Sequence, residues 1–174
     1  MKNWIPIPGT KKEALLKVAI DEFKNNAFTD VNINELAKKA EMTTGAVYHH
    51  FSSKTNLYTI IREEMEQRLI DRMEGAATLF QTSNEKSSAA MTTTLSFVYE
   101  QNLCLLLGSP HPEGMIGKVD QYIASIQDNE DLPLEVILLP AWRSVLLRLH
   151  REEITLEQGQ NLLKWLYQKG KKEN

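Results

Sequence analysis

The feature that most constrains this fold is a nine-residue stretch, residues 43–51, whose helical pattern has two unlike faces. Read as an α-helix, it places Val47 and Phe51 four residues apart on one apolar stripe. Thr43 supplies the hydroxyl that a helix N-cap requires. Four residues lie off this apolar stripe and are not typical of a protein core: Thr44, Gly45, Tyr48 and His49. The pattern therefore predicts one face for packing and one face for a partner.

A second short helix is predicted immediately upstream, over residues 32–40. Asn32 and Glu35 have the spacing of a capping box, with asparagine in place of the usual serine or threonine. The apolar residues follow the i, i+3, i+4, i+7 spacing of a buried face, at Ile33, Leu36, Ala37 and Ala40. A tight turn at residues 41–42 separates the two helices, so the pair is predicted to form a helix-turn-helix.

Residues 11–60 resemble the DNA-binding domain of the TetR family of transcriptional regulators, while the remainder shows no motif of its own. The most diagnostic part is the run Gly45-x-x-Tyr48-x-x-Phe51-x-x-Lys54-x-x-Leu57. The other matching positions are Ala19, Phe23, Phe28, Ile33, Glu35, Leu36, Ala37, Ala40, the rest of residues 42–51, and Ser53. The resemblance implies a sequence-specific DNA-binding regulator, by default a repressor that a small molecule releases.

Two positions depart from the family pattern. Ala27 and Glu41 stand where family members commonly carry glycine. A left-handed backbone at Ala27 costs about 1 kcal/mol or more, unless Asn26 takes that conformation instead. Both departures concern the turns and leave the motif itself in place.

The rest of the chain predicts further helices and hence an all-α fold. Ser52 or Ser53 is expected to cap a long helix over about residues 53–79 that joins the head to a helical body. Its inward row repeats every four residues at Leu57, Ile61, Met65, Leu69 and Met73. Its solvated face is predicted at Arg62, Glu63, Glu66, Arg68, Asp71 and Arg72.

Downstream, a polar break is expected at residues 82–88, a helix at about 88–107 and a loop at 108–117. A weaker helix is predicted over about 115–128. The apolar segment 134–149 is predicted to be buried on more than one side, with Pro140 kinking it or marking its start. Thr155 and Gln158 have capping-box spacing and open a last helix that runs to about residue 168.

We therefore predict a DNA-binding head at residues 1–56, with an N-terminal arm at 1–10, and a regulatory and dimerisation body at 57–174. The arm is expected to be disordered, to pack on the body, or to reach the minor groove. The head holds eight lysines against six acidic residues, so it is weakly basic, although the whole chain has a net charge of -3. Phosphate contacts should therefore also use helix N-termini and neutral donors.

The candidate DNA-binding residues are Thr43, Thr44, Gly45, Tyr48, His49, His50 and Lys54. The hydroxyls and imidazole of Thr44, Tyr48 and His50 can donate to phosphates, as the resemblance implies. Thr44, Gly45 and His49 are expected to meet base edges, and Tyr48 a thymine methyl or a phosphate. The alternative for His50 is a structural histidine. Lys11, Lys12, Lys38 and Lys39 add general attraction, although Lys38 and Lys39 are equally consistent with a plain solvated face.

A single helix-turn-helix reads one half-site, so a palindromic operator on double-stranded DNA requires a homodimer. We expect the last two helices to supply the interface through Val145, Leu149, Leu162, Leu163 and Leu166; the alternative is that these residues close the core of one chain. An apolar or aromatic effector is expected among the body helices. The candidate pocket residues are Met91, Phe97, Tyr99, Tyr122 and Trp142, which equally suit a plain core.

Other classes of protein are disfavoured by what the sequence lacks. Cys104 is the only cysteine, which excludes an internal disulfide and a zinc ribbon and fits a reducing cytoplasm. No metal-ligand or nucleophile motif surrounds the four histidines, and no cofactor or metal is expected. No run approaches the ~20 apolar residues of a membrane span. An enzyme and a helical protein-binding adaptor remain as minor alternatives.

Overall fold

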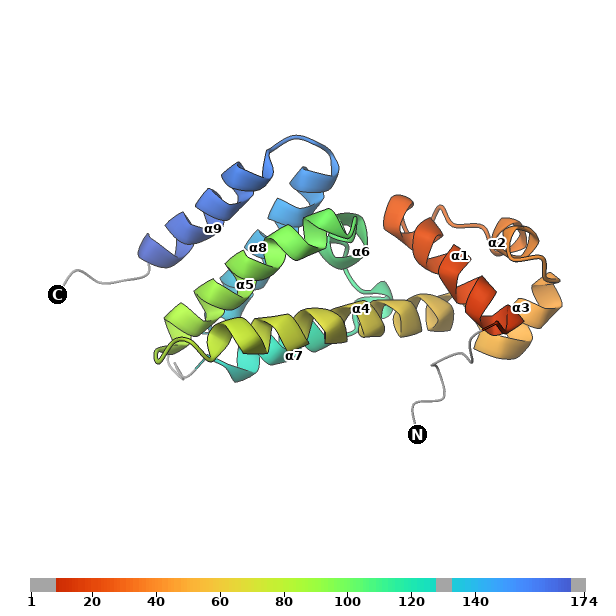
Figure 1. The fold of residues 1–174 in the computed structure, drawn as a ribbon, viewed down its shortest axis with the longest axis horizontal. Coiled ribbons are helices and arrows are strands. Elements are labelled where there is room, and N and C mark those ends of the chain that lie inside the picture. The colour runs from red at the N-terminus through yellow and green to blue at the C-terminus, as the bar shows by residue number, and fades with distance from the viewer. Residues whose placement is uncertain (1–8, 128–132, 170–174) are drawn as a thin grey trace. The chain divides into compact units, whose positions relative to one another are not determined.

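The computed structural model describes residues 9–127 and 133–169, and its regular structure is helical (Figure 1). The α-helices are α1 (Lys11–Asn25), α2 (Ile33–Lys39), α3 (Thr44–Phe51), α4 (Lys54–Ala77), α5 (Ser83–Glu100), α6 (Cys104–Gly108), α7 (Lys118–Ser125), α8 (Glu135–His150) and α9 (Leu156–Lys169), with a 3₁₀ turn, η1, at Pro112–Gly114. The predicted all-α class with an N-terminal helix-turn-helix is confirmed. Most of the expected N-terminal arm, residues 1–8, lies outside the described residues.

The chain divides into two compact units at the step from Glu64 to Met65. From here on, the head is the described part of the chain up to Glu64, in place of the predicted 1–56, and the body is the described part from Met65. The long helix α4 begins in the head and ends in the body. Helix–helix contacts within the head join α1 to α2 and α2 to α3, as a helix-turn-helix domain requires.

An aromatic cluster fills the centre of the head. The Phe23 and Tyr58 rings meet edge to face with centroids 5.0 Å apart, and the Phe28 and Tyr58 centroids lie 5.1 Å apart. Such edge-to-face pairs stabilise a core beyond the area that they bury. Thr10 caps α1, because its Oγ1 accepts a hydrogen bond from the backbone N–H of Glu13 at 3.3 Å.

The turn after α1 does not use the left-handed backbone that the sequence suggested. Asn26 has a φ of -129°, and Ala27 is not among the non-glycine residues with positive φ. Instead, the backbone N–H groups of Asp30 and Val31 donate to the carbonyl oxygen of Ala27 at 2.9 and 3.3 Å. The expected strain at Ala27 is therefore wrong, since this turn closes without glycine.

Helix α4 confirms its predicted inward row but is buried over a wider arc. Ser53 caps it, with Oγ accepting from the N–H of Asn56 at 3.0 Å. The row from Leu57 to Met73 is buried throughout. The adjacent stripe is buried too, at Tyr58, Arg62, Glu66 and Ile70. Placing Arg62 and Glu66 on the solvated face was therefore wrong; the other four residues of that set are exposed or half-buried as expected.

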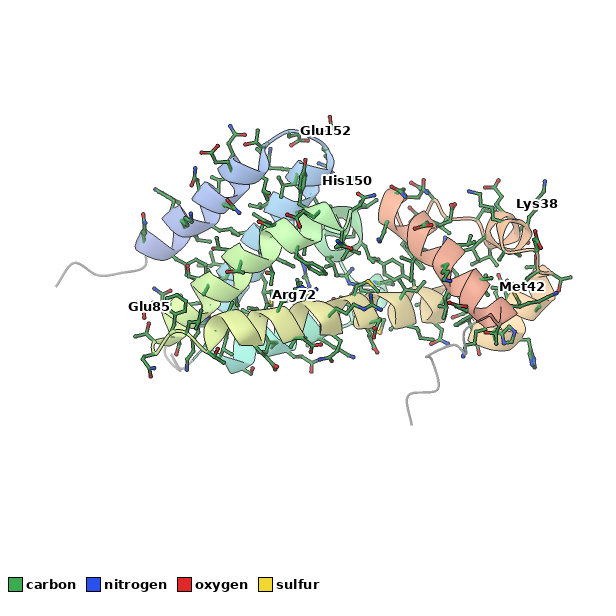
Figure 2. All side chains as sticks on the ribbon, viewed as in Figure 1. Lys38, Met42, Arg72, Glu85, His150 and Glu152 are labelled. Carbon is green, nitrogen blue, oxygen red and sulfur yellow. The ribbon has the colours of Figure 1, made fainter. Side chains whose placement is uncertain are left out.

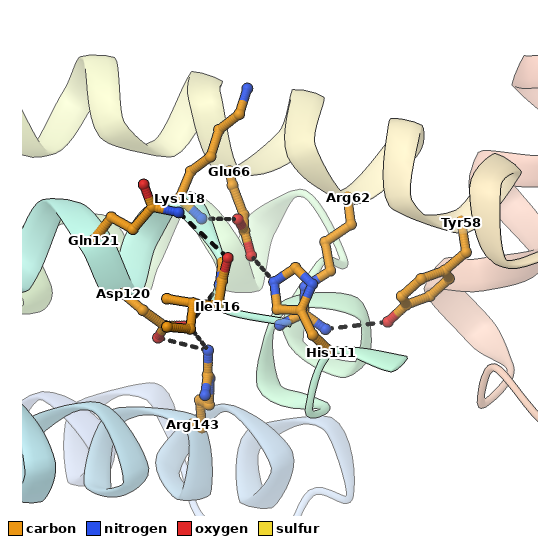
Figure 3. A network of polar contacts seen from close by, with 10 residues as sticks. Tyr58, Arg62, Glu66, His111, Ile116, Lys118, Asp120, Gln121 and Arg143 are labelled. Carbon is orange, nitrogen blue, oxygen red and sulfur yellow. Dashed lines mark hydrogen bonds and ion pairs between the residues drawn. The ribbon is translucent and has the colours of Figure 1, made fainter. Parts of the chain in front are cut away.

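The buried carboxylate of Glu66 holds three segments of the body together (Figure 3). Its Oε1 lies 2.8 Å from Nε2 of His111, and its Oε2 accepts from the backbone N–H of Lys118 at 2.7 Å. Gly117 passes so close that a Cβ there would lie 2.4 Å from the His111 Nε2. Glu66 therefore fixes the loop before α7 and the first turn of α7 against α4.

A second ion pair extends this arrangement to α8. Asp120 in the first turn of α7 accepts from the backbone N–H of Gly117 at 3.0 Å. The same carboxylate accepts from Nη2 of Arg143 on α8, with both oxygens 2.6 Å away. The start of α7 is thus fixed from α4 on one side and from α8 on the other (Figure 3).

Helix α5 begins earlier and ends earlier than predicted. The expected polar break at 82–88 is wrong, because Thr82 is an N-cap whose Oγ1 accepts from the N–H of Glu85 at 3.3 Å. The chain then breaks after Glu100, where Asn102 adopts a φ of 53°, and resumes as α6. The single helix predicted over 88–107 is therefore two helices.

The C-terminal part combines a confirmed cap with an unexpected exposed surface. Thr155 and Gln158 form the predicted capping box, with bonds of 2.8 and 3.2 Å in the two directions. Pro140 lies inside α8 and does not mark its start. The predicted burial of this segment on several sides is wrong, since Val136 and Ile137 are 65% and 60% exposed.

Helix α9 approaches the rest of the body closely at Gly159. A Cβ at this position would lie 3.0 Å from Cγ1 of Val145 on α8 and 3.2 Å from Cδ2 of Leu95 on α5.

Cys104 is buried, and burial raises the pKa of its thiol to about 11, which agrees with a core role. Within residues 9–127 and 133–169, no helix has the length and apolar character needed to cross a membrane.

The Glu66 contacts generate a stability prediction. Replacing Glu66 by alanine leaves the His111 ring and the Lys118 N–H without their buried acceptor, so the free energy of unfolding should fall by about 3 kcal/mol. Urea unfolding followed by circular dichroism measures this change. Glu74→Ala, at an exposed position on the same helix, is the matched control and should shift stability little. Equal effects of the two substitutions would contradict the role given to Glu66.

Candidate nucleic-acid interface

Helix α3 presents the two faces that its sequence predicts. Thr43 caps it, with Oγ1 accepting from the N–H of Ala46 at 3.2 Å. Val47 and Phe51 are buried in the head core. The opposite face is open, with Tyr48 46% exposed and both His49 and His50 exposed. The helix is therefore anchored through one stripe while a phenol and two imidazoles face outward.

The exposure of His50 disfavours the alternative that it is a structural histidine. A structural histidine would be buried and hydrogen-bonded, whereas His50 is exposed and its ring lies 5.6 Å from that of His49. Both imidazoles are consequently available to an external acceptor. Gly45 is also exposed, and a Cβ added there would meet only Oγ1 of Thr43, at 4.0 Å. The backbone at Gly45 is thus open to close approach.

Thr44 differs from its predicted role as a phosphate donor. Its hydroxyl donates to Oδ1 of Asn34 on α2 at 2.9 Å. Because a hydroxyl carries one hydrogen, the Thr44 side chain can only accept from a further partner in this arrangement. Sequence reasoning missed Asn34, whose signal was a second amide side chain two residues after the Asn32 cap.

The cap of α2 also differs in detail from the predicted box. The Asn32 Oδ1 accepts from the N–H of Asn34 at 2.8 Å, whereas the capping-box spacing pointed to Glu35. This leaves the first turn of α2 close to the start of α3, where Asn34 reaches Thr44. The contact fixes the spacing of the two motif helices.

Lys54 is held within the head. Its Nζ donates to the carbonyl oxygen of Thr29 at 3.2 Å and lies 4.7 Å from the centroid of the Phe28 ring. Partial burial lowers the pKa of this ammonium group, partly opposed by the charge of Asp30. An ammonium has three donors, so a phosphate contact by Lys54 is compatible with the bond to Thr29.

The other lysines of the head divide into free and engaged groups. Lys11 and Lys38 are exposed. Lys39 forms an ion pair with Glu22 that joins α2 to α1, and this hydrogen bond raises the pKa of Lys39. The Lys12 Nζ lies 5.6 Å from the centroid of the Phe51 ring. The attraction available from these lysines is therefore weaker than their number suggests.

The candidate pocket residues of the body do not converge on one site. Met91 and Trp142 are buried in the core, and the phenol of Tyr167 lies 2.8 Å from the Met91 sulfur. Tyr122 is half-buried on α7, and Tyr99 is exposed beside a small hollow near the turn from α8 to α9. Of the five, Phe97 alone lines a cleft of about 820 Å³ in the described body.

The predicted interface residues also separate into two groups. Val145, Leu149 and Leu163 are buried within the chain itself, which favours the alternative that they close its core. Leu166 is half-buried, and Leu162 is 48% exposed. The apolar side chains that the described body leaves exposed on α8 and α9 are Val136, Ile137, Leu162 and Trp165.

Comparison with known proteins identifies the helix-turn-helix region. Residues 15–59 match the model of a family described as bacterial regulatory proteins, tetR family. The HTH-type transcriptional regulator AcrR of Shigella flexneri is 35% identical over 66 residues, which cover 34% of this chain and 31% of AcrR. The match thus spans less than a third of that relative's length.

Solved structures extend the similarity to the whole fold. A TetR-like transcriptional regulator from Rhodococcus sp. RHA1 has a TM-score of 0.65 at 19% identity, with 95% of this chain and 98% of that chain covered. The transcriptional regulator FadR from Bacillus subtilis, in complex with stearoyl-CoA, has a TM-score of 0.64 at 14% identity over 89% and 97% of the two chains. At these identities the similarity establishes the shared fold alone.

The turn between α2 and α3 yields a prediction about stability. Glu41 adopts a φ of 53°, a left-handed conformation that favours glycine. Glu41→Gly should relieve about 1–2 kcal/mol of strain at a smaller entropic cost, so a net gain of roughly 0.5–1 kcal/mol is expected. Thermal unfolding of the variant measures it. Glu35→Gly, inside α2, should instead lose about 1 kcal/mol; a loss at both positions would contradict the strain assigned to Glu41.

Proposed function

Because this chain belongs to the TetR family, we propose that it is a DNA-binding transcriptional regulator, a repressor that a small molecule bound in the body releases. TetR family regulators are not enzymes, in keeping with this proposal. The observation that carries it is the α3 surface, where a core-anchored helix leaves Gly45, Tyr48, His49 and His50 open. A surface of small, aromatic and hydrogen-bonding groups on a second motif helix suits the major groove of DNA.

The proposed roles follow from what each side chain can reach. Gly45 lets the α3 backbone approach the groove, and His49 offers ring nitrogens to base edges. Tyr48 and His50 donate to phosphates, and Lys54 adds charge near the N-terminus of α4. Thr43 and Thr44 shape the start of α3, and the Thr44 oxygen is left to accept from a base amino group. With few free lysines, we expect these neutral donors to contribute much of the affinity.

The proposed dimer uses the exposed apolar residues of α8 and α9. The short connection at residues 151–155 makes the two helices antiparallel neighbours, and Gly159 lies against Val145 and Leu149. The start of α8, with Val136 and Ile137, therefore lies toward the same end of the pair as Trp165. A second copy related by two-fold symmetry would cover such a face and place two heads on a palindromic operator. Leu162 and Leu166 remain in the proposed interface.

The effector is proposed to bind in the body and shift the equilibrium between two arrangements of the dimer. A ligand achieves this only by binding one arrangement more tightly than the other. FadR of Bacillus subtilis, a structural relative, was solved with stearoyl-CoA. Together with the largely apolar cleft of about 820 Å³, this supports an effector with a substantial apolar part.

The first test of this function concerns α3. Tyr48→Ala and His49→Ala should each weaken binding to an operator fragment by about 1–3 kcal/mol, because each removes a groove or phosphate contact. A gel-shift titration at fixed salt measures the change, and thermal unfolding verifies that the head remains folded. Added salt should weaken binding by the wild-type chain through counterion release.

Tyr99→Ala is the matched control for Tyr48. The two tyrosines are 47% and 46% exposed, but Tyr99 lies in the body. Its loss should leave operator binding unchanged. If Tyr48→Ala and Tyr99→Ala bind the operator equally well, or if the chain binds no duplex at all, α3 does not read DNA and a protein-binding adaptor becomes the better description.

The second test concerns the dimer. Trp165→Asp places a charge in the proposed apolar interface, so the variant should be monomeric by light scattering and should lose most operator affinity. Ile116→Asp alters a side chain that is 72% exposed in the loop before α7 and should leave the oligomeric state unchanged. A wild-type monomer, or an intact dimer of the Trp165 variant, would contradict the proposed interface.

A further inference from the structure

A cleft in the described body is lined by residues of α4, α5 and α9 and of the turn from α4 to α5. Its lining is mostly small or apolar and includes Leu79, Phe80, Ala89 and Phe97, together with the cations Arg72 and Lys164. The cleft encloses about 820 Å³, which falls in the range of roughly 300–1,000 Å³ typical of small-molecule sites. Leu79 and Phe80, at 79% and 39% exposure, remain uncovered apolar groups at its edge.

The charges of this cleft are separated along its length. At one end Arg72 extends from α4 toward α5 (Figure 2), and its guanidinium lies 3.8 Å from the centroid of the Phe97 ring. Lys164 also lines the cleft, and it lies opposite the part of α5 between Met91 and Ser96, because α9 runs antiparallel to α5: Gln160 bonds Ser96 at 3.0 Å and Tyr167 contacts Met91. The other end, at the turn from α4 to α5, holds Leu79, Phe80 and the carboxylate of Glu85.

The exposed apolar face proposed for the dimer leaves this cleft open. At 100° per residue, Lys164, Tyr167 and Gln168 lie on one side of α9, while Leu162 and Trp165 lie on the other. Neither Leu162 nor Trp165 lines the cleft. A second copy covering the outer side of α9 therefore does not fill the groove on its inner side.

We propose that this cleft binds an amphipathic anion, a molecule with one acidic group and a flexible apolar chain. The acidic group lies against Arg72 and Lys164, and the chain runs toward Leu79 and Phe80. The Arg72 guanidinium is held in place, since it stacks on Phe97 and donates to the carbonyl oxygen of Arg68 at 3.0 Å. Glu85 opposes the reverse orientation, because its carboxylate would repel the acidic group of the ligand if that group lay at the apolar end. The inference rests on the proposed function and names its effector class.

Isothermal titration with two probes tests whether the cleft recognises an acidic head group. The probes are dodecanoate and dodecanol, which share the same chain and differ in the head group, and both are used below the concentration at which they aggregate. The wild-type dimer should bind dodecanoate more tightly than dodecanol. Replacing both cations, Arg72→Met with Lys164→Met, should reduce dodecanoate affinity about tenfold or more and leave dodecanol nearly unchanged. Arg68→Met, one turn earlier on α4 and outside the cleft, should bind both as the wild type does.

A blocking variant locates the binding site independently of charge. Ala89→Trp fills the apolar part of the cleft and should abolish binding of both probes while the thermal midpoint and the dimer persist. Equal binding of dodecanoate and dodecanol, unchanged binding by the double methionine variant, or no binding by the wild type would overturn the proposal. A change of oligomeric state caused by Ala89→Trp would assign the cleft to a second copy and overturn it equally.

Operator binding separates this inference from the proposed function. Dodecanoate should weaken operator binding by the wild type and have no effect on Ala89→Trp. If the wild type binds the operator but no dodecanoate, the proposed DNA-binding function is kept and the proposed ligand class is wrong. If the wild type binds dodecanoate as described but no DNA duplex, the proposed ligand site is kept and the proposed DNA-binding function is wrong.

Discussion

The body depends on one buried carboxylate, that of Glu66 on α4. A buried charge is stable only where hydrogen bonds replace the water that it has lost. Glu66 obtains them from the His111 ring and from the N–H of Lys118, two segments 45 and 52 residues away in the chain. If the loop before α7 or the start of α7 moved away from α4, the Glu66 carboxylate would therefore lose its hydrogen-bond donors or become exposed to solvent. Gly117 is part of the same constraint, because any side chain there would occupy the space of the pair.

Periodicity predicted most of the helices but could not show how wide their buried faces are. On α4 the apolar row from Leu57 to Met73 was correct, whereas Arg62 and Glu66 in the next stripe looked like surface residues because both are charged. Burial of a charge depends on a partner distant in sequence, which no local pattern contains. The α5 start was missed for a related reason: a run of serine, threonine and asparagine favours a loop and a helix cap equally, and Thr82 proved to be a cap.

The recognition surface was easier to foresee than the interface. An exposed phenol and imidazole on a helix violate the core pattern, so Tyr48 and His49 stood out from sequence alone. Leucines give no such signal, because the same side chain suits a monomer core and a subunit contact. Val145, Leu149 and Leu163 proved to be core, and the exposed apolar groups of α8 and α9 lie elsewhere on the two helices. A helix pattern indicates an apolar face without saying what covers it.

The buried thiol of Cys104 gives this protein an internal reporter. Burial raises the pKa of this thiol to about 11, so it is protonated at pH 7, and the group is shielded from reagents as well. Alkylation of the native chain must then wait for α6 to come away from its neighbours. Because the chain has a single cysteine, the rate of its modification measures the opening of that region without any added label.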